Sequence, residues 1–213
     1  MTTAHSPGKK CQIGEAYQRS PLPKGFMENN QINRMPIKAH PYKHQRRAYE
    51  FACRLFGLTG HDPPASRGVA LLMEMGTGKS LTAIAVAGRL FLDHKVERML
   101  IVAPLSILGV WQEEFRKFAD FEYSLIVLNG SESQKIEKLR QIPTLGLQVA
   151  IINYESAWRL EQELAAWDAD LIVCDEGHKI KTHNIAASKC MHRFGARARY
   201  RMLLTGTIIT NKA

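Results

Sequence analysis

The chain has few cysteines and no long hydrophobic run, and both shortages exclude whole classes of protein. Its four cysteines are widely spaced and form no Cys-x-x-Cys pair, so neither a zinc site nor a disulfide-stapled secreted domain is expected. No apolar stretch approaches the roughly 20 residues that a membrane helix needs. The N-terminal stretch "MTTAHSPGKKCQ" also lacks the apolar core of a secretory signal. These absences predict a cytoplasmic, intracellular protein without a membrane partner.

Acidic residues are scarce at both ends of the chain. Residues 1–50 hold nine lysines and arginines against three acidic residues, and residues 179–213 hold eight against none. Residues 51–178 carry seventeen acidic residues against twelve basic ones, so the net charge of +9 comes from the two ends. Basic ends are typical of proteins that bind a polyanion such as nucleic acid. Solvated charges with no partner would explain them equally well.

Regular periodicity is missing from the first part of the chain. Residues 1–37 are polar, are interrupted by "SPLPKG" and "RMPIK", and are predicted to form a flexible basic arm. Residues 38–213 form the second predicted unit. It opens with "YKHQRRAYEFACRLFGL" (42–58), whose apolar spacing and late glycine indicate an amphipathic helix.

Six short apolar runs alternate with helical stretches over the rest of the chain. Strands that are apolar on both faces and separated by helices are typical of a mainly parallel sheet with helices on both faces. The predicted fold class is therefore three-layer α/β. The predicted strands are 69–73, 99–103, 124–128, 148–152, 170–175 and 201–206, and the helical stretches between them are 80–93, 106–119, 133–142, 155–167 and 185–196.

The stretch "LLMEMGTGKSLTAIAVAGRL" (71–90) has the spelling of a phosphate-binding loop between a strand and a helix. Gly76 and Gly78 allow a close approach of the backbone to a ligand, and successive N–H groups at a helix N-terminus bind anions. Lys79 would reach the β- and γ-phosphates, and the Ser80 hydroxyl would bind Mg²⁺. Because the pattern GxxxxGK(S/T) asks for a glycine where this chain has Met73, an ordinary strand–turn–helix remains open on this stretch alone.

An acidic pair follows the fifth predicted strand in "LIVCDEGHKIK". Ligands of open parallel sheets bind beyond the carboxyl ends of the strands, so Asp175 and Glu176 are expected on the same edge as Lys79. Metal-assisted nucleotide hydrolysis requires such a pair: one carboxylate holds Mg²⁺, usually through water, and the other orients the attacking water. The bland alternative is a strand that ends in a solvated turn.

Six segments between residues 40 and 211 together resemble the superfamily-two helicases and translocases, and in particular their Swi/Snf-like branch. "DEGH" is similar to the DExH box, and "MEMGTGKS" to that branch's phosphate loop "DEMGxGKT". The others are "PYKHQ" (like "LxPHQ"), "IVAPLSILGVWQEEF" (like "PxSxxxxW"), "VAIINYESAW" (like "ITTYE") and "RMLLTGTIITN" (like "RLLLTGTPxxN"). They stand in the family's order and cover nearly all of the chain beyond the N-terminal arm. The resemblance implies the first RecA-like lobe of such a motor.

Roles carried over from the family follow these motifs residue by residue. The resemblance implies that Gln45 reads adenine, that Gly76–Ser80 hold the phosphates and Mg²⁺, and that Asp175 binds Mg²⁺ through water. It implies that Glu176 positions the catalytic water and that His178 contacts the nucleotide and couples it to DNA. The residues that it assigns to the DNA track are Ser106, Thr205, Gly206 and Thr207. Lys181 is a further candidate because it stands in the basic stretch "KIKTHN", which is either a nucleic-acid face or simply solvated.

Some positions depart from the family's pattern. Met73 replaces the branch's Asp, Lys43 replaces the proline of "LxPHQ", and Thr182 falls where "RxKN" has Asn. Ile208 replaces the proline of "TGTP", which shapes a turn in the segment that couples nucleotide to DNA. Outside the motifs, the three tryptophans lie on helical stretches and are predicted to fill the core or an interface rather than to stack on bases; they are Trp111, Trp158 and Trp167.

The family places a second RecA-like lobe after the sixth motif, and the nucleotide cleft lies between the two lobes. We therefore expect this lobe to need a second one, in the same longer protein or in trans, before it can hydrolyse ATP rapidly or move on DNA, and we favour duplex DNA. The alternative is a catalytically silent module that only binds nucleotide or DNA. A small-molecule kinase would explain neither "DEGH" nor "TGT".

Overall fold

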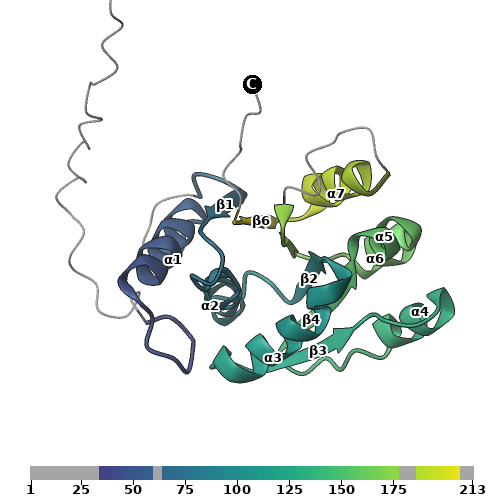
Figure 1. Cartoon of the computed structure of the whole chain (residues 1–213), viewed down its shortest axis with the longest axis horizontal. Helices are drawn as coiled ribbons and strands as arrows, with labels where there is room; N and C mark the ends of the chain where they lie inside the picture. The colour runs from purple at the N-terminus through teal and green to yellow at the C-terminus, as the bar shows by residue number, and fades with distance from the viewer. Residues whose placement is uncertain (1–33, 60–63, 178–185, 207–213) are drawn as a thin grey trace, which may run out of the picture. The chain divides into compact units, whose positions relative to one another are not determined.

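The computed structural model describes residues 34–59, 64–177 and 186–206. In this part of the chain, six parallel strands form one sheet, which confirms the predicted α/β class (Figure 1). The strand order is β1-β6-β5-β2-β4-β3. The strands are β1 (Gly68–Leu72), β2 (Arg98–Ala103), β3 (Tyr123–Val127), β4 (Leu147–Asn153), β5 (Leu171–Cys174) and β6 (Tyr200–Thr205). Each boundary lies within one residue of the predicted one.

Helices cover both faces of the sheet. On one face, α1 (Lys43–Leu55), α2 (Lys79–Leu92), the short 3-10 helix η1 (Leu105–Ile107) and α3 (Leu108–Phe118) enclose one apolar cluster. On the other, α4 (Glu132–Arg140), α5 (Tyr154–Arg159), α6 (Glu161–Trp167) and α7 (Ala186–Arg197) enclose a second. Strand β2 serves both clusters: Met99 and Ile101 face the first, whereas Leu100 and Val102 face the second. Burial on both faces explains why the strands read as continuous apolar runs.

Two predicted helices differ from the observed ones at their ends or in the middle. The helix predicted for 42–58 ends at Leu55, because Gly57 adopts a φ of 68° and stops it. The helical stretch 155–167 is two helices, α5 and α6, which meet at Leu160 with ψ near 29°. The apolar spacing alone did not show this break.

Residues just before the predicted start of the domain pack on its core. Met35 and Ile37 are buried, and Ile37 forms a bridge with Ala119 at the end of α3. The boundary at residue 38 stays a prediction, as does the arm over 1–37, of which residues 1–33 lie outside the described residues. Among the described residues, no helix is both long enough and apolar enough to cross a membrane.

Candidate nucleotide-binding site

The carboxyl edge of the sheet brings the two predicted motifs together. Strand β6 pairs with β1 on one side and with β5 on the other, so the loop after β1 and the turn after β5 flank the end of β6. The Met73 N–H donates to the Thr205 carbonyl at 3.2 Å, which ties the start of the loop to that strand. A Cβ placed on Gly206 would lie 3.3 Å from Lys79 Nζ. Residues more than 120 positions apart in the sequence therefore meet at this edge.

The loop between β1 and α2 has the backbone geometry that its glycines predict. Gly76 has a φ of 77° and Gly78 a φ of 86°, both in the left-handed region that side chains disfavour. Gly78 is also the residue from which the fourteen-residue helix α2 starts. A glycine-rich loop that leads into a helix N-terminus is typical of anion sites, because its N–H groups and the helix dipole favour phosphate.

The missing glycine of the longer pattern has a simple physical explanation. Among the described residues, Met73 is not one of those with positive φ, so its backbone does not call for glycine. What Met73 contributes is its carbonyl, which accepts a hydrogen bond from Lys79 Nζ at 3.1 Å. Lys79 donates a second one to the Glu74 carbonyl at 3.0 Å. The ammonium group therefore lies across its own loop, and of its three N–H donors the two used here could turn to phosphate oxygens.

Gln45 lies against the phosphate loop. Its Nε2 donates to the Thr77 carbonyl at 3.0 Å, and its Oε1 accepts from the Tyr42 N–H at 2.9 Å. His44 Nε2 lies 2.9 Å from the same Thr77 carbonyl. A Cβ on Gly78 would lie 2.3 Å from Gln45 Nε2, so glycine is required there by space as well as by φ. The start of α1 and the loop therefore form one unit, while adenine reading by Gln45 stays a prediction.

Asp175 is a buried carboxylate with only 6% of its surface exposed. Its Oδ2 accepts from Trp111 Nε1 at 2.9 Å, and its Oδ1 accepts from the Glu176 backbone N–H at 2.8 Å. Burial raises the pKa of this carboxyl above its ordinary value, and the two hydrogen bonds and the positive charge of Lys79 oppose that rise. The negative charge of the neighbouring Glu176 adds to the rise of this pKa.

Glu176 has a φ of 51°, which is rare for a residue with a side chain. Backbone strain of this kind concentrates at functional sites. Gly177 follows, and a Cβ there would lie 2.3 Å from the Leu203 side chain of β6, so only glycine fits this close approach. The Glu176 residue itself is half-buried at the sheet edge.

The hydrogen bonds that hold Asp175 were not predicted. Trp111 is buried, as expected of a core tryptophan, yet its indole N–H also binds the carboxylate. Tyr154 is buried at the start of α5, and its hydroxyl donates to the Asp175 carbonyl at 2.6 Å. Both residues stand in motifs quoted above, and that is the one signal that could have drawn attention to them. Trp158, by contrast, is 39% exposed.

Of the remaining predicted site residues, the structure describes some and not others. Ser80 is half-buried in the first turn of α2, Ser106 is exposed in η1, and Thr205 is buried at the end of β6, directly before Gly206. His178, Lys181, Thr182, Thr207 and Ile208 lie outside the described residues. Within the described ranges there is no cluster of three or more His, Cys, Asp or Glu side chains that could hold a metal. A metal here would therefore depend on Asp175, Ser80 and phosphate oxygens.

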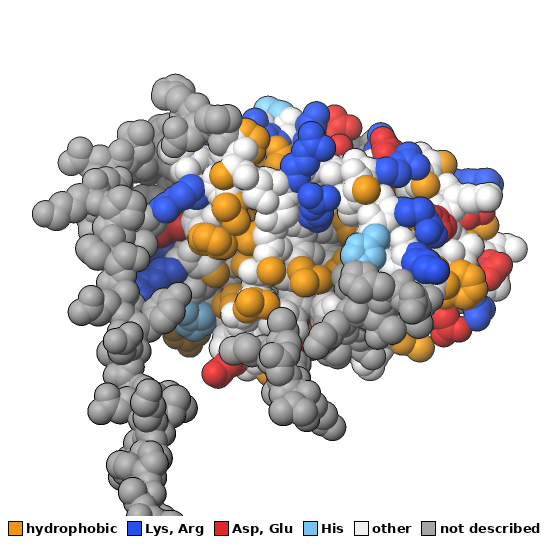
Figure 2. Space-filling view, turned by 90° about the horizontal axis from the view of Figure 1, so that it is seen from above, with side chains coloured by type: hydrophobic (Ala, Val, Ile, Leu, Met, Phe, Trp, Pro, Cys, Tyr) orange, Lys and Arg blue, Asp and Glu red, His pale blue; other side chains and the backbone are white. Residues whose placement is uncertain are grey.

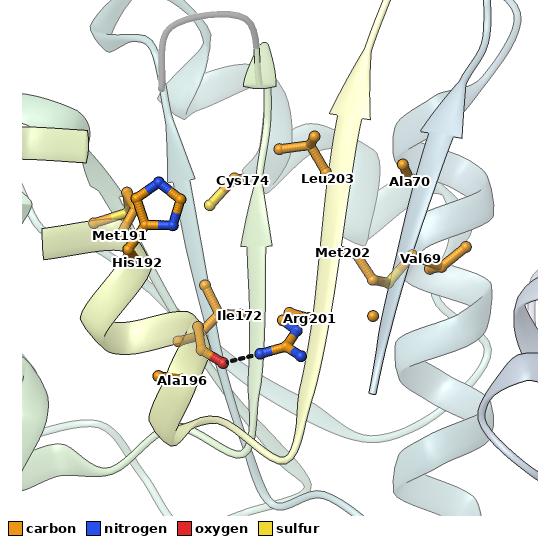
Figure 3. A pocket seen from close by; sticks show the side chains of 12 residues that line it. Val69, Ala70, Ile172, Cys174, Met191, His192, Ala196, Arg201, Met202 and Leu203 are labelled. Carbon is orange, nitrogen blue, oxygen red and sulfur yellow. Dashed lines mark hydrogen bonds between the residues drawn. The ribbon is translucent and has the colours of Figure 1, made fainter. Parts of the chain in front are cut away.

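A hollow of about 500 Å³ lies away from this edge, on the sheet face between β1, β6 and α7 (Figure 3). Its floor includes Ala70 and Leu203, and the Arg201 guanidinium lies across it and donates to the Gly195 carbonyl. Seen from above, this side of the molecule shows hydrophobic side chains beside a group of lysines and arginines (Figure 2). Neither Lys79 nor Asp175 lines the hollow, although Cys174, the residue before Asp175, does.

Comparisons with known proteins agree with this geometry. The sequence model of the SNF2-related domain family matches residues 24–213. The chain is 31% identical over 150 residues to the DNA repair and recombination protein RAD54B of Gallus gallus, covering 68% of this chain and 16% of that protein. It is 33% identical over 139 residues to the probable ATP-dependent DNA helicase CHR23 of Arabidopsis thaliana, covering 65% of this chain and 13% of that protein.

A solved structure is similar over a larger share of the chain. The Sulfolobus solfataricus SWI2/SNF2 ATPase core in complex with dsDNA matches with a TM-score of 0.66 and 27% identity, over 83% of this chain and 34% of that one. The chain thus spans less than a fifth of the two curated relatives named above and about a third of the solved core. Its sheet, its phosphate loop and these matches together show that the chain belongs to the SNF2-related domain family.

Proposed function

We propose that this domain is the first motor lobe of a DNA-dependent ATPase, and that it binds ATP and Mg²⁺ at the carboxyl edge of its sheet. The observation that carries the proposal is the placement of the phosphate loop after β1 and of Asp175 after β5 on the two sides of the end of β6, where a Cβ on Gly206 would lie 3.3 Å from Lys79 Nζ. A lysine at a helix N-terminus and a fixed carboxylate beside it are the two charges that phosphate and its metal require.

Different residues at this edge would bind the phosphates, the Mg²⁺ ion and the attacking water. The backbone N–H groups of 76–80 and the ammonium of Lys79 would bind the phosphates. The carboxylate of Asp175 and the hydroxyl of Ser80 offer the oxygen ligands that Mg²⁺ prefers, directly or through water. When bound, Mg²⁺ would neutralise charge on the phosphates. Glu176, the next residue after the fixed Asp175, would orient the attacking water.

A lone lobe supports only part of this cycle. In nucleotide hydrolases where it has been measured, an arginine finger raises the rate about 10³- to 10⁵-fold, and the family supplies it from the second lobe. We propose that a second RecA-like lobe, in the same longer protein or in trans, completes the cleft, and that the partner nucleic acid is duplex DNA. The 213 residues alone should therefore turn over ATP slowly.

The test is ATP turnover by the purified chain, with and without duplex DNA, beside a Glu176→Gln variant. Glu137→Gln is a matched control, because Glu137 is exposed on α4. We expect slow turnover that duplex DNA stimulates, that Glu176→Gln abolishes and that the control retains. Equal turnover by Glu176→Gln and the unchanged chain would contradict the proposed role of Glu176. A chain that binds nucleotide but never hydrolyses it, even with DNA, would favour the silent module instead.

A further inference from the structure

Asp175 is held by contacts from parts of the chain that are distant in sequence. Trp111, which lies 64 residues earlier on α3, donates its indole N–H to Oδ2 at 2.9 Å. Only 1% of the Trp111 surface and 6% of the Asp175 surface are exposed. A donor and an acceptor that are both removed from water keep each other satisfied, so this bond is not exchanged for bonds to solvent.

The remaining contacts fix the rest of the aspartate. Oδ1 accepts from the Glu176 backbone N–H at 2.8 Å, and the Asp175 carbonyl accepts from the Tyr154 hydroxyl at 2.6 Å. The Asp175 N–H donates to the Val102 carbonyl of β2 at 2.8 Å. Its backbone is therefore bound on both sides. With one donor on each carboxylate oxygen, rotation about the last side-chain bond would break two hydrogen bonds at once.

Trp111 can act as a positioning group because it is itself immobile. It lies on α3 within the buried cluster of the first sheet face and packs against Phe115, with ring centroids 6.4 Å apart. An indole offers one N–H donor and no acceptor, so it can only donate to an oxygen of the carboxyl group and does not compete for a cation. A carboxylate oxygen has a second lone pair, which stays available to a metal or to its water.

We propose that Trp111 is a positioning residue, which holds the Asp175 carboxylate in the orientation that binds Mg²⁺ or its water. This inference rests on the proposed function, since it takes Asp175 as the residue that receives the metal. Groups that orient a metal ligand in this way change metal affinity about 10- to 100-fold when they are removed. The role differs from core filling, because it depends on the N–H group and not on the volume of the ring.

The variant that separates the two roles is Trp111→Phe, which keeps an aromatic ring in the core and removes the donor. Trp158→Phe is the matched control, because Trp158 is 39% exposed and its ring lies against the Arg159 guanidinium, 5.6 Å from the ring centroid. Binding of a fluorescent ADP analogue is titrated with Mg²⁺ and, separately, measured in EDTA. We expect Trp111→Phe to raise the Mg²⁺ concentration at half-saturation about tenfold, with unchanged binding in EDTA. The control should match the unchanged chain in both.

An NMR measurement on Trp111 in the unchanged chain complements the Trp111→Phe variant. The indole ¹⁵N–¹H resonance of Trp111, assigned by its loss in Trp111→Phe, should move when Mg²⁺ and nucleotide are added and should move in Asp175→Asn. The resonances of Trp158 and Trp167 should stay in place. This reading does not depend on turnover, and should Trp111→Phe fail to fold, assignment through the Trp158→Phe and Trp167→Phe variants keeps the test in place.

Two failures are distinguishable. If Asp175→Asn raises the Mg²⁺ requirement and Trp111→Phe does not, Asp175 receives the metal without help from Trp111, and the inference is overturned. If Asp175→Asn itself leaves the Mg²⁺ requirement unchanged, the proposed metal site is wrong and the inference fails with it.

Discussion

The two halves of the candidate site are built in different ways. The lysine of the phosphate loop is held by short-range contacts: Lys79 donates to carbonyls five and six residues before it, and two glycines set the backbone around it. The aspartate after β5 is held by side chains from two other helices, Trp111 on α3 and Tyr154 at the start of α5. The lysine has to turn from its own loop towards phosphate, whereas the carboxylate is already held in place.

This difference indicates that the aspartate of the site is preorganised for its ligand and that the lysine is not. Lysine is a flexible point charge that can leave carbonyls for phosphate with little steric cost. A buried carboxylate that changed partners would leave donors unsatisfied in the core. We therefore expect the loop to move on nucleotide binding and the Asp175 side chain to stay. The experiments that follow alter one half at a time, in order of expected effect on the free energy of unfolding.

Removing the tryptophan should cause the largest loss. Trp111→Ala removes a fully buried ring and the donor to Asp175, so we expect a loss of about 3–5 kcal/mol in the free energy of unfolding. Trp158→Ala, at a half-exposed ring, should cost less than about 1 kcal/mol. Urea denaturation of the two variants measures the difference. Similar midpoints for both would mean that the core around Asp175 is looser than the structure shows.

Replacing either glycine of the phosphate loop with alanine should lower the stability of the protein. Gly78→Ala forces a left-handed φ on a residue with a side chain, at about 1–2 kcal/mol, and pushes against the Gln45 amide. Gly76→Ala imposes the φ strain alone, because a Cβ there meets nothing within 4 Å. Gly78→Ala should therefore be the less stable of the two by thermal denaturation. The reverse order would show that Gln45 does not pack on the loop.

The smallest effect is expected from the tyrosine that binds the Asp175 carbonyl. Tyr154→Phe removes one buried hydrogen bond and should cost about 1 kcal/mol. Burial raises the pKa of Tyr154, so its hydroxyl stays protonated and keeps donating throughout the neutral range. Tyr42→Phe, at a ring that is 71% exposed, should change nothing measurable. Chemical denaturation of both variants, with m-values compared, resolves a difference of this size.

Local pattern predicted much of the fold and little of the contact network. Strands β2, β4 and β5 are almost wholly buried, and the apolar runs located all six strands within one residue. Strand order could not be read, because neighbours such as β1 and β6 lie far apart in the sequence. The break at Leu160 was also missed, since both α5 and α6 continue the same helical spacing.

In the candidate site, too, the motif residues were predicted from the sequence and the contacts between distant residues were not. Lys79, Asp175 and their neighbours were identified because each motif is a short run of residues after a strand. The Trp111–Asp175 bond joins residues 64 apart, and the Gln45–Thr77 bond joins residues 32 apart, so neither follows from any local pattern. The replacement of glycine by Met73 looked like a defect, but the position supplies a carbonyl and not a positive φ.

The central claim is that the carboxyl edge of this sheet binds nucleotide phosphate through Lys79. Calorimetric titration of the chain with ATP and Mg²⁺, beside Lys79→Ala and the control Lys117→Ala, tests it most directly. We predict binding to the unchanged chain and to the control, and an affinity at least about tenfold lower for Lys79→Ala, the size expected when a charged hydrogen bond is lost. Equal affinities for all three proteins would contradict the account.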